Sequence, residues 1–228
     1  MKLLKRILRK VKTTLFLAGG SKSGEFYWRY RHFFDKSWAQ SYIAAENLDD
    51  EHRRFVFKKI KSKAPFKSIL EFGCASGPNL YWLGREFPGT ECYGVDISEK
   101  AIREGQKFFK KENIKNVSLK AGGAGSLKKF GAKSVDLIFT DATLLYFGKD
   151  KIKNILNEIL RVAGKKIIFF EMHHDQPDSV FRGNWIHNYK SLFENLCPSA
   201  KVKISRLPEN IWRSGGWTKY GNMIEISL

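Results

Sequence analysis

From residue 67 onward, short apolar runs alternate with amphipathic segments, and this alternation limits the fold more than any other feature of the sequence. Strands that alternate with helices along a chain form a mostly parallel sheet with helices on both faces. The sequence predicts strands near 68–72, 91–97, 117–120, 135–140, 166–171, 201–207 and 222–228. It predicts helices near 79–87, 99–111, 150–162 and 185–196. No helix separates the last two strands, so we expect them to pair antiparallel at one edge.

The first predicted strand leads directly into a glycine turn. The segment reads Ile69-Leu70-Glu71-Phe72-Gly73-Cys74-Ala75-Ser76-Gly77, an apolar run ending at an acid and followed by two glycines. Glycines permit a tight turn and let a ligand approach the backbone closely. The second strand also ends in an acid, Asp96, and an acid at that place accepts hydrogen bonds from ribose hydroxyls.

A nicotinamide site is disfavoured by the same segment. Such a site needs Gly-x-Gly-x-x-Gly, so that a pyrophosphate can sit on the helix N-terminus. Here Ala75 stands where the middle glycine would be. Glu71 lies two residues before the first glycine, where it suits a cationic group of the ligand better than a pyrophosphate.

On these residues the chain, from about residue 66 to its end, resembles the class I S-adenosylmethionine-dependent methyltransferases. The resemblance implies a Rossmann-like α/β fold, a doubly wound sheet of seven strands in the order 3-2-1-4-5-7-6 with strand 7 antiparallel. It implies S-adenosyl-L-methionine as cofactor, its methionine part near Glu71 and the glycine turn, its ribose on Asp96 and its adenine against Ile97. The residues expected to bind the cofactor are Glu71, Gly73, Cys74, Ala75, Gly77, Asp96, Ile97, Gly123, Ala124 and Asp141. The family often has Gly-Asp-Ala after the third strand, where this chain has Gly122-Gly123-Ala124.

The acceptor should meet the methyl group at the carboxyl ends of the fourth and fifth strands. The candidate general bases there are Asp141, His173 and His174. A base is needed only if the nucleophile is a hydroxyl or a protonated amine. Asp141 has the alternative role of capping its loop or contacting the methionine amine. We expect no metal, because adjacent histidines in a strand point to opposite faces and no third ligand is suitably spaced.

Two groups of aromatic residues are further candidates for the site. Tyr27, Trp28 and Tyr30 either form a lid over the cofactor or belong to a helix packed on the core. Trp212 and Trp217 precede the last strand and are candidates to line the acceptor pocket.

The acceptor class is open between several alternatives. No Asn/Asp-Pro-Pro-Tyr segment, typical of enzymes that methylate base amines, follows the fourth strand. The positive net charge is therefore the only sequence feature that favours RNA as the acceptor. We expect O- or N-methylation of a small-molecule, glycan or lipid-linked acceptor, with an RNA methyltransferase or a non-catalytic cofactor-binding relative as the alternatives.

The charge of the chain is strongly basic, and part of it is concentrated at the N-terminus. The formal net charge is +18, and residues 1–24 hold seven cations and no acid. Leu3, Leu4, Ile7, Leu8, Val11 and Leu15 recur at helical spacing. That pattern predicts a basic amphipathic helix, which either contacts an anionic membrane, packs on its own domain or binds RNA.

We therefore divide the chain into a basic arm (1–20), an aromatic-rich helical cap (21–65, with a helix over 35–63) and a methyltransferase domain (66–228). The glycine-rich segment 19–24 predicts a flexible hinge between arm and cap. The three cysteines share no metal-site or disulfide spacing, which favours a reducing compartment. We expect a cytoplasmic protein, peripheral at the inner membrane face if the arm binds lipid. No apolar run reaches the roughly 18 residues of a membrane span.

Overall fold

Seven strands form one twisted sheet in the computed structural model, which describes residues 18–176, 179–212 and 215–228. Their order is β3-β2-β1-β4-β5-β9-β8, in which β1 to β5 run parallel and β9 runs antiparallel to both of its neighbours. The strands are β1 (Ser68–Phe72), β2 (Glu91–Asp96), β3 (Val117–Ala121), β4 (Val135–Asp141), β5 (Ala163–Met172), β8 (Lys201–Arg206) and β9 (Gly221–Ser227). The predicted sheet order and the antiparallel pair at its edge are confirmed.

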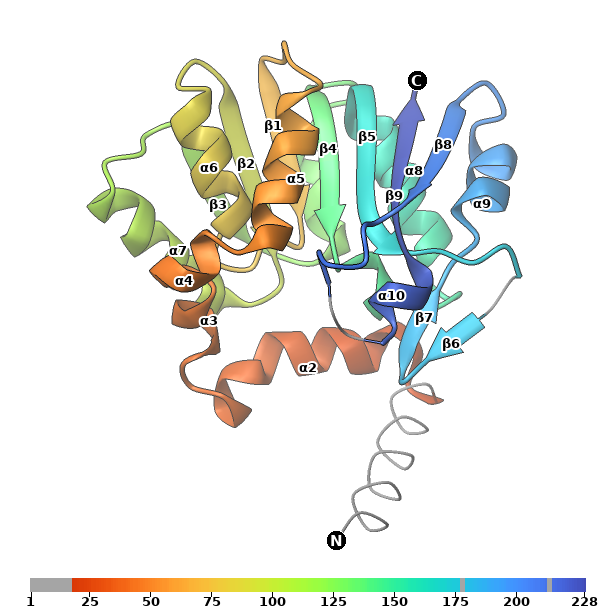
Figure 1. Ribbon diagram of the computed structural model, residues 1–228, viewed down its shortest axis with the longest axis horizontal. Coiled ribbons are helices and arrows are strands. Elements are labelled where there is room, and N and C mark those ends of the chain that lie inside the picture. Colours follow the sequence, from red (N-terminus) through yellow and green to blue (C-terminus); the bar gives the residue numbers. More distant parts are fainter. Residues whose placement is uncertain (1–17, 177–178, 213–214) are drawn as a thin grey trace, which may run out of the picture.

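Helices cover both faces of the sheet (Figure 1). One face carries α5 (Glu51–Lys61), α6 (Pro78–Glu86) and α7 (Glu99–Lys111), and the other carries α8 (Ile152–Val162) and α9 (Tyr189–Leu196). Successive strand residues point to opposite faces, so Ile69 packs under the first group of helices and Leu70 under the second. The predicted helices 99–111 and 150–162 match α7 and α8 within two residues.

The cap lies across the carboxyl ends of the parallel strands, at the lower edge of the sheet in Figure 1. It contains α2 (Gly20–Phe34), α3 (Trp38–Ser41) and α4 (Ala45–Leu48), and it leads into α5. The single helix predicted over 35–63 is therefore divided into three. Asp50 explains the last break, because its side chain accepts a hydrogen bond from the amide of His52 at 2.7 Å and caps α5.

The hinge predicted at 19–24 is wrong, because α2 begins within it. The Ser21 hydroxyl donates to Asp150 Oδ1 at 2.7 Å and accepts from the amide of Gly148 at 2.8 Å. A Cβ on Gly24 would lie only 2.7 Å from the carbonyl oxygen of Tyr146. These small residues permit close packing of α2 on the loop after β4 and do not provide flexibility.

A small hairpin after β5 was not expected from the sequence. It pairs β6 (Ser179–Phe181) with β7 (Asn184–Ile186) through Arg182 and Gly183, which both have positive φ angles, as a tight hairpin turn requires. The predicted helix 185–196 therefore begins later, at Tyr189, where the Asn188 side chain caps α9.

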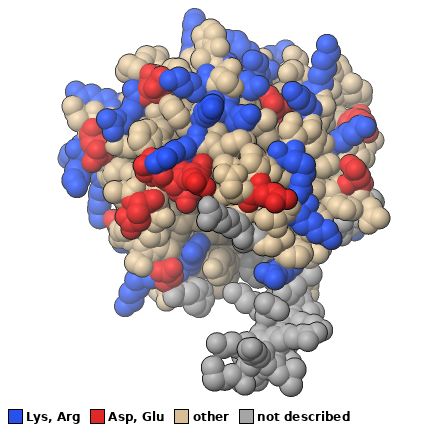
Figure 2. Space-filling view, viewed as in Figure 1, with Lys and Arg blue, Asp and Glu red and all other residues tan. Residues whose placement is uncertain are grey.

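Two short 3₁₀ helices, η1 (Ala124–Lys129) and η2 (Leu144–Tyr146), follow β3 and β4, and α10 (Trp217–Tyr220) precedes β9. Nearly all of the predicted basic arm lies outside the described residues. Within the described ranges, no helix has the length and apolar character needed to cross a membrane. Lys and Arg side chains are spread over the face seen in Figure 2, while acidic side chains gather over α4 and the start of α5.

Candidate active site

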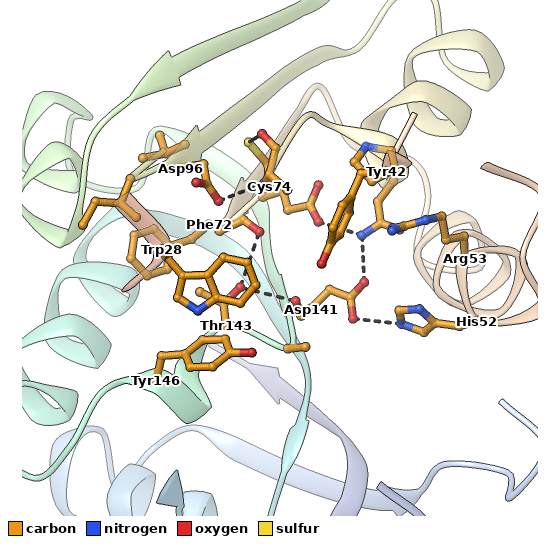
Figure 3. Close-up of a pocket in the computed structure, with 18 of the residues that line it drawn as sticks. Trp28, Tyr42, His52, Arg53, Phe72, Cys74, Asp96, Asp141, Thr143 and Tyr146 are labelled. Atoms are coloured by element: carbon orange, nitrogen blue, oxygen red, sulfur yellow. Dashed lines mark hydrogen bonds and ion pairs between the residues drawn. The ribbon is translucent and has the colours of Figure 1, made fainter. Parts of the chain in front are cut away.

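A cavity of about 700 Å³ lies at the carboxyl ends of β1, β2 and β4, beneath the cap (Figure 3). One side is formed by the glycine turn after β1 and by the ends of the strands. The other side is formed by cap residues, among them Gly24, Trp28, Tyr42, His52 and Arg53. The cavity is therefore shared between segments far apart in the sequence.

The glycine turn has the backbone geometry that its residues predict. Gly73 has a φ of 86°, and a Cβ there would lie 2.0 Å from Thr143 Oγ1, so that only glycine fits. Cys74 and Ala75 line the cavity. Gly77 does not line it and instead begins α6 with a φ of 84°, packed closely on Phe109.

Asp96 ends β2 at the cavity wall. Its carboxylate accepts hydrogen bonds from the amides of Ala75 at 2.9 Å and Ser98 at 2.8 Å. Burial raises its pKa from the ordinary value, against the effect of these two bonds. Ile97 and Gly123 line the cavity beside it, whereas Ala124 begins η1 and does not line it.

Glu71 is a buried acid with one unsatisfied oxygen. Its Oε1 accepts from Asn79 Nδ2 at 2.7 Å, and its fully buried Oε2 has no partner among the residues that the structure describes. Burial, assisted by the nearby charge of Asp141, raises the pKa of Glu71 to about 8. A cationic group entering the cavity beside this carboxyl would supply the missing partner, so the residue fits the amine of a methionine moiety.

Asp141 ends β4 and lies 2.9 Å from His52, measured from Oδ1 to Nε2 (Figure 3). Its Oδ2 accepts from the same Asn79 amide, also at 2.9 Å. Burial raises the pKa of Asp141, but His52, Arg53 and Asn79 together lower it below the ordinary value. Asp141 therefore stays ionised, while Glu71, on the other side of Asn79, is held neutral.

His52 was not predicted from the sequence to belong to the site. It lies on the first turn of α5, is 8% exposed and stacks on Trp212, with the ring centroids 3.9 Å apart. Trp212 in turn stacks on Trp217 at 3.7 Å. Of these two tryptophans, Trp212 lines the cavity and Trp217 supports it from behind. No local sequence motif marks His52, whose helix begins after the capping residue Asp50.

The two histidines predicted as bases lie away from this cavity. His173 Nδ1 accepts from the amide of Tyr189 at 3.3 Å, and burial lowers the pKa of its imidazole. His174 Nδ1 accepts from the amide of Gln176 at 3.0 Å. Neither residue lines the cavity. Of the three predicted bases, the structure brings only Asp141 to it.

The aromatic segment of α2 contributes one residue to the cavity. Trp28 lines it and packs edge-on against Tyr146 at 5.0 Å, whereas Tyr27 and Tyr30 do not line it. Among the described residues, no group of three His, Cys, Asp or Glu side chains could hold a metal ion.

Comparison with known proteins identifies the domain. Residues 69–166 match the family model described as "Methyltransferase domain". The chain carries a class I S-adenosylmethionine-dependent methyltransferase domain. The matched methyltransferase segment runs from β1 into β5 and contains Glu71, Asp96 and Asp141.

Relatives of this methyltransferase domain are distant. An uncharacterized protein of Rickettsia prowazekii (strain Madrid E) is 33% identical over 105 residues, which is 45% of this chain and 42% of that protein. A methyltransferase of Aquifex aeolicus has 16% identity and a TM-score of 0.63, covering 85% of this chain and 98% of the other. Magnesium protoporphyrin IX methyltransferase of Synechocystis has 15% identity and a TM-score of 0.62, covering 91% and 96%. Phosphoethanolamine N-methyltransferase 1 of Haemonchus contortus has 18% identity and a TM-score of 0.64, covering 91% and 48%. At these identities the solved structures show the shared fold.

S-Adenosylmethionine is the cofactor of this family, and the residues of the cavity fit it. The buried Oε2 of Glu71 suits the methionine amine, and the Asp96 carboxylate, which lines the same cavity, suits the hydroxyls of a ribose. Asp141 and His52 lie on the wall beyond them.

Proposed function

We propose that this methyltransferase methylates a hydroxyl or amine of a small-molecule, glycan or lipid-linked acceptor, and that His52 removes the acceptor's proton. The observation that carries the proposal is the pair formed by His52 and Asp141 on the cavity wall, 2.9 Å apart. Glu71, Gly73, Cys74, Ala75, Asp96, Ile97 and Gly123 are the proposed cofactor contacts that line the cavity.

The pairing with Asp141 orients the His52 ring on the cavity wall. Asp141 is ionised, so its Oδ1 accepts the Nε2–H of the imidazole. That hydrogen bond fixes the tautomer in which Nδ1 carries the lone pair. The same arrangement stabilises the imidazolium after the proton has arrived, because its positive charge forms beside the Asp141 carboxylate.

The bound cofactor supplies an activated methyl group on a sulfonium sulfur. When bound in this cavity, S-adenosylmethionine would supply its methyl group to the acceptor oxygen or nitrogen and would leave as the neutral thioether. The acceptor's proton moves to His52 Nδ1, so the charges balance. The remaining task of the cavity is to align the acceptor and to exclude water.

The dimensions of the cavity support a small acceptor group. A volume of about 700 Å³ lies within the roughly 300–1,000 Å³ typical of small-molecule sites. Three structural neighbours are named for small acceptors: phosphoethanolamine, magnesium protoporphyrin IX and geranyl diphosphate. The RNA alternative is supported by the net charge of +18, and the open cavity argues against a relative that has lost catalysis.

Peripheral membrane contact through residues 1–18, at the cytoplasmic face, forms part of the proposal. It is supported by six cations and no acid within the first 17 residues, combined with an apolar residue pattern at helical spacing.

The test is transfer of label from methyl-labelled S-adenosylmethionine to fractions of a cell extract. We expect label in a small-molecule or lipid fraction with the native chain, and none with His52→Gln, which keeps a donor for Asp141 but has no basic nitrogen. Label in RNA would reject the proposed acceptor class, and undiminished transfer by His52→Gln would reject the base.

A further inference from the structure

The outer face of α2 carries a row of exposed aromatic side chains. Phe26, Tyr30 and Phe33 are 61%, 38% and 69% exposed and follow one another at helical spacing. Their rings touch in sequence, with centroids 4.9 Å apart for Phe26 and Tyr30 and 6.1 Å apart for Tyr30 and Phe33. Among the described residues, only Val180 and Leu228 are other large apolar side chains with comparable exposure.

This exposure does not result from an undocked helix. The opposite face of α2 is held to the domain through Ser21, which is fully buried, and through Gly24 and Trp28, which line the cavity. Glu25 is also engaged, by an ion pair with Lys151 at 2.7 Å. The helix is therefore fixed by one face, and the aromatic row is available on the other.

The charges around the aromatic row are positive. Lys22 and Arg29 are exposed and stand four residues before and three residues after Phe26, which places them along the same face. Asp35, the first acid after Glu25, follows the end of the helix and lies 3.9 Å from Arg31. Residues 1–17, which precede α2 in the sequence, contain six cations and no acid.

We propose that the outer face of α2, comprising Lys22, Phe26, Arg29, Tyr30 and Phe33, docks on the surface of an anionic lipid bilayer. Aromatic side chains are favoured at the level of the headgroups, and cations beside them attract lipid phosphates. Helix α2 lies at an edge of the molecule (Figure 1), and its exposed aromatic row is therefore accessible to a flat surface.

Docking in this manner would bring the membrane to the site. The inner face of the same helix lines the cavity, and an α-helix with its side chains is only about 10–12 Å across. A lipid-linked acceptor would then reach the cavity from the bilayer, an extension that rests on the proposed function. The docking itself does not depend on catalysis.

The first test labels the surface directly. In the full chain with Cys197→Ser, the variant Phe33→Cys is labelled with an environment-sensitive nitrobenzoxadiazole dye, since Cys74 and Cys92 are buried. The matched control is Leu228→Cys, an exposed apolar position at the C-terminus, at the far edge of the molecule in Figure 1. We expect the fluorescence to increase only for the first variant, with vesicles of equal parts phosphatidylglycerol and phosphatidylcholine. A fluorescence increase that follows protein concentration without lipid would indicate that a second copy of the chain covers this face. A fluorescence increase with RNA alone would indicate that the face binds nucleic acid. Either result overturns the proposal, and so does unchanged fluorescence with the vesicles.

The second test measures vesicle flotation of Phe26→Ser/Phe33→Ser against Leu228→Ser. We expect roughly tenfold weaker binding for the double variant and no loss for the control, because two large apolar side chains leave the interface. S-Adenosylhomocysteine binding, measured in parallel, should stay unchanged. Equal flotation of both variants would overturn the proposal, whereas failure of the proposed methyl transfer would leave flotation unaffected.

Discussion

His52 and Asp141 connect the cap to the sheet, with Nε2 of the first 2.9 Å from Oδ1 of the second. The two residues are 89 positions apart, one on the first turn of α5 and the other at the end of β4. Because Asp141 also accepts from Asn79, which donates to Glu71, a continuous polar network crosses the cavity wall. His52, Arg53 and Asn79 lower the pKa of Asp141, whereas burial raises the pKa of Glu71, so the two carboxyl groups of this network differ in ionisation.

Replacing His52 tests the proposed base. For His52→Gln we expect kcat to fall by about 10²–10⁴, the usual range for loss of a general base. S-Adenosylhomocysteine binding should change little. His174→Gln is the matched control; if it reduces kcat as much as His52→Gln, the assignment of the base to this cavity is wrong.

Asp96 tests the cofactor site. We expect Asp96→Ala to weaken S-adenosylhomocysteine binding by about tenfold or more, because hydrogen bonds to a charged carboxylate contribute roughly 1.5–3 kcal/mol each. Calorimetry measures the loss directly. Asp49→Ala removes an exposed carboxylate outside the cavity and should bind like the native chain. Native-like binding by Asp96→Ala would exclude the ribose contact.

Glu71 predicts how the stability of the cofactor-free protein depends on pH. Burial raises its pKa from 4.5 to about 8, so the native state holds a proton that the unfolded state releases above about pH 4.5. This contribution to the free energy of unfolding is complete at low pH and is lost as the pH rises through about 8. In Glu71→Gln the decline between pH 5 and 8 should be shallower, measured by denaturant unfolding at several pH values. Glu112→Gln, at an exposed position, should reproduce the native slope; an equally steep slope in Glu71→Gln would show that Glu71 is not buried as a neutral acid.

Gly24 tests how α2 is docked. A Cβ at this position would lie 2.7 Å from the carbonyl oxygen of Tyr146, so Gly24→Ala must displace the helix. We expect a loss of about 1–3 kcal/mol in the free energy of unfolding, typical of overpacking, together with weaker cofactor binding. Gly125→Ala is the control, because a Cβ there would have no atom of the described residues within 4 Å. Equal stability of the two variants would mean that α2 does not pack on the loop after β4.

The double variant Leu4→Ser/Leu8→Ser in the full chain tests the proposed membrane contact of residues 1–17. Each cation near an anionic surface contributes roughly 1 kcal/mol that salt screens, whereas apolar burial is not screened. We expect the double variant to bind anionic vesicles more weakly and to lose part of the binding that remains at high salt in the native chain. Thr13→Ser/Thr14→Ser should bind as the native chain does. RNA binding that is steeply dependent on salt and indifferent to the leucines would favour the nucleic-acid alternative.

The sequence by itself determined the sheet and the cofactor end of the site. Strand periodicity, the glycine turn and the strand-ending acids Glu71, Asp96 and Asp141 are local features, and parallel strands bring their carboxyl ends to one edge. The antiparallel pair at the edge could therefore be predicted, as could the placement of those three acids around one cavity. The order of the strands was implied by the resemblance to the class I methyltransferases.

The tertiary structure decided which residues complete that cavity. His52 carries no local signal, and it reaches Asp141 only because α5 packs on the sheet beside α6. His173 and His174 follow β5 at the expected edge, but the backbone amides of Tyr189 and Gln176 occupy their Nδ1 atoms. Likewise, the glycines of α2 predict flexibility from the sequence, but in the structure Gly24 allows the helix to pack closely against Tyr146. A side chain's partners across the fold depend on how distant segments pack, and local periodicity contains no information about that packing.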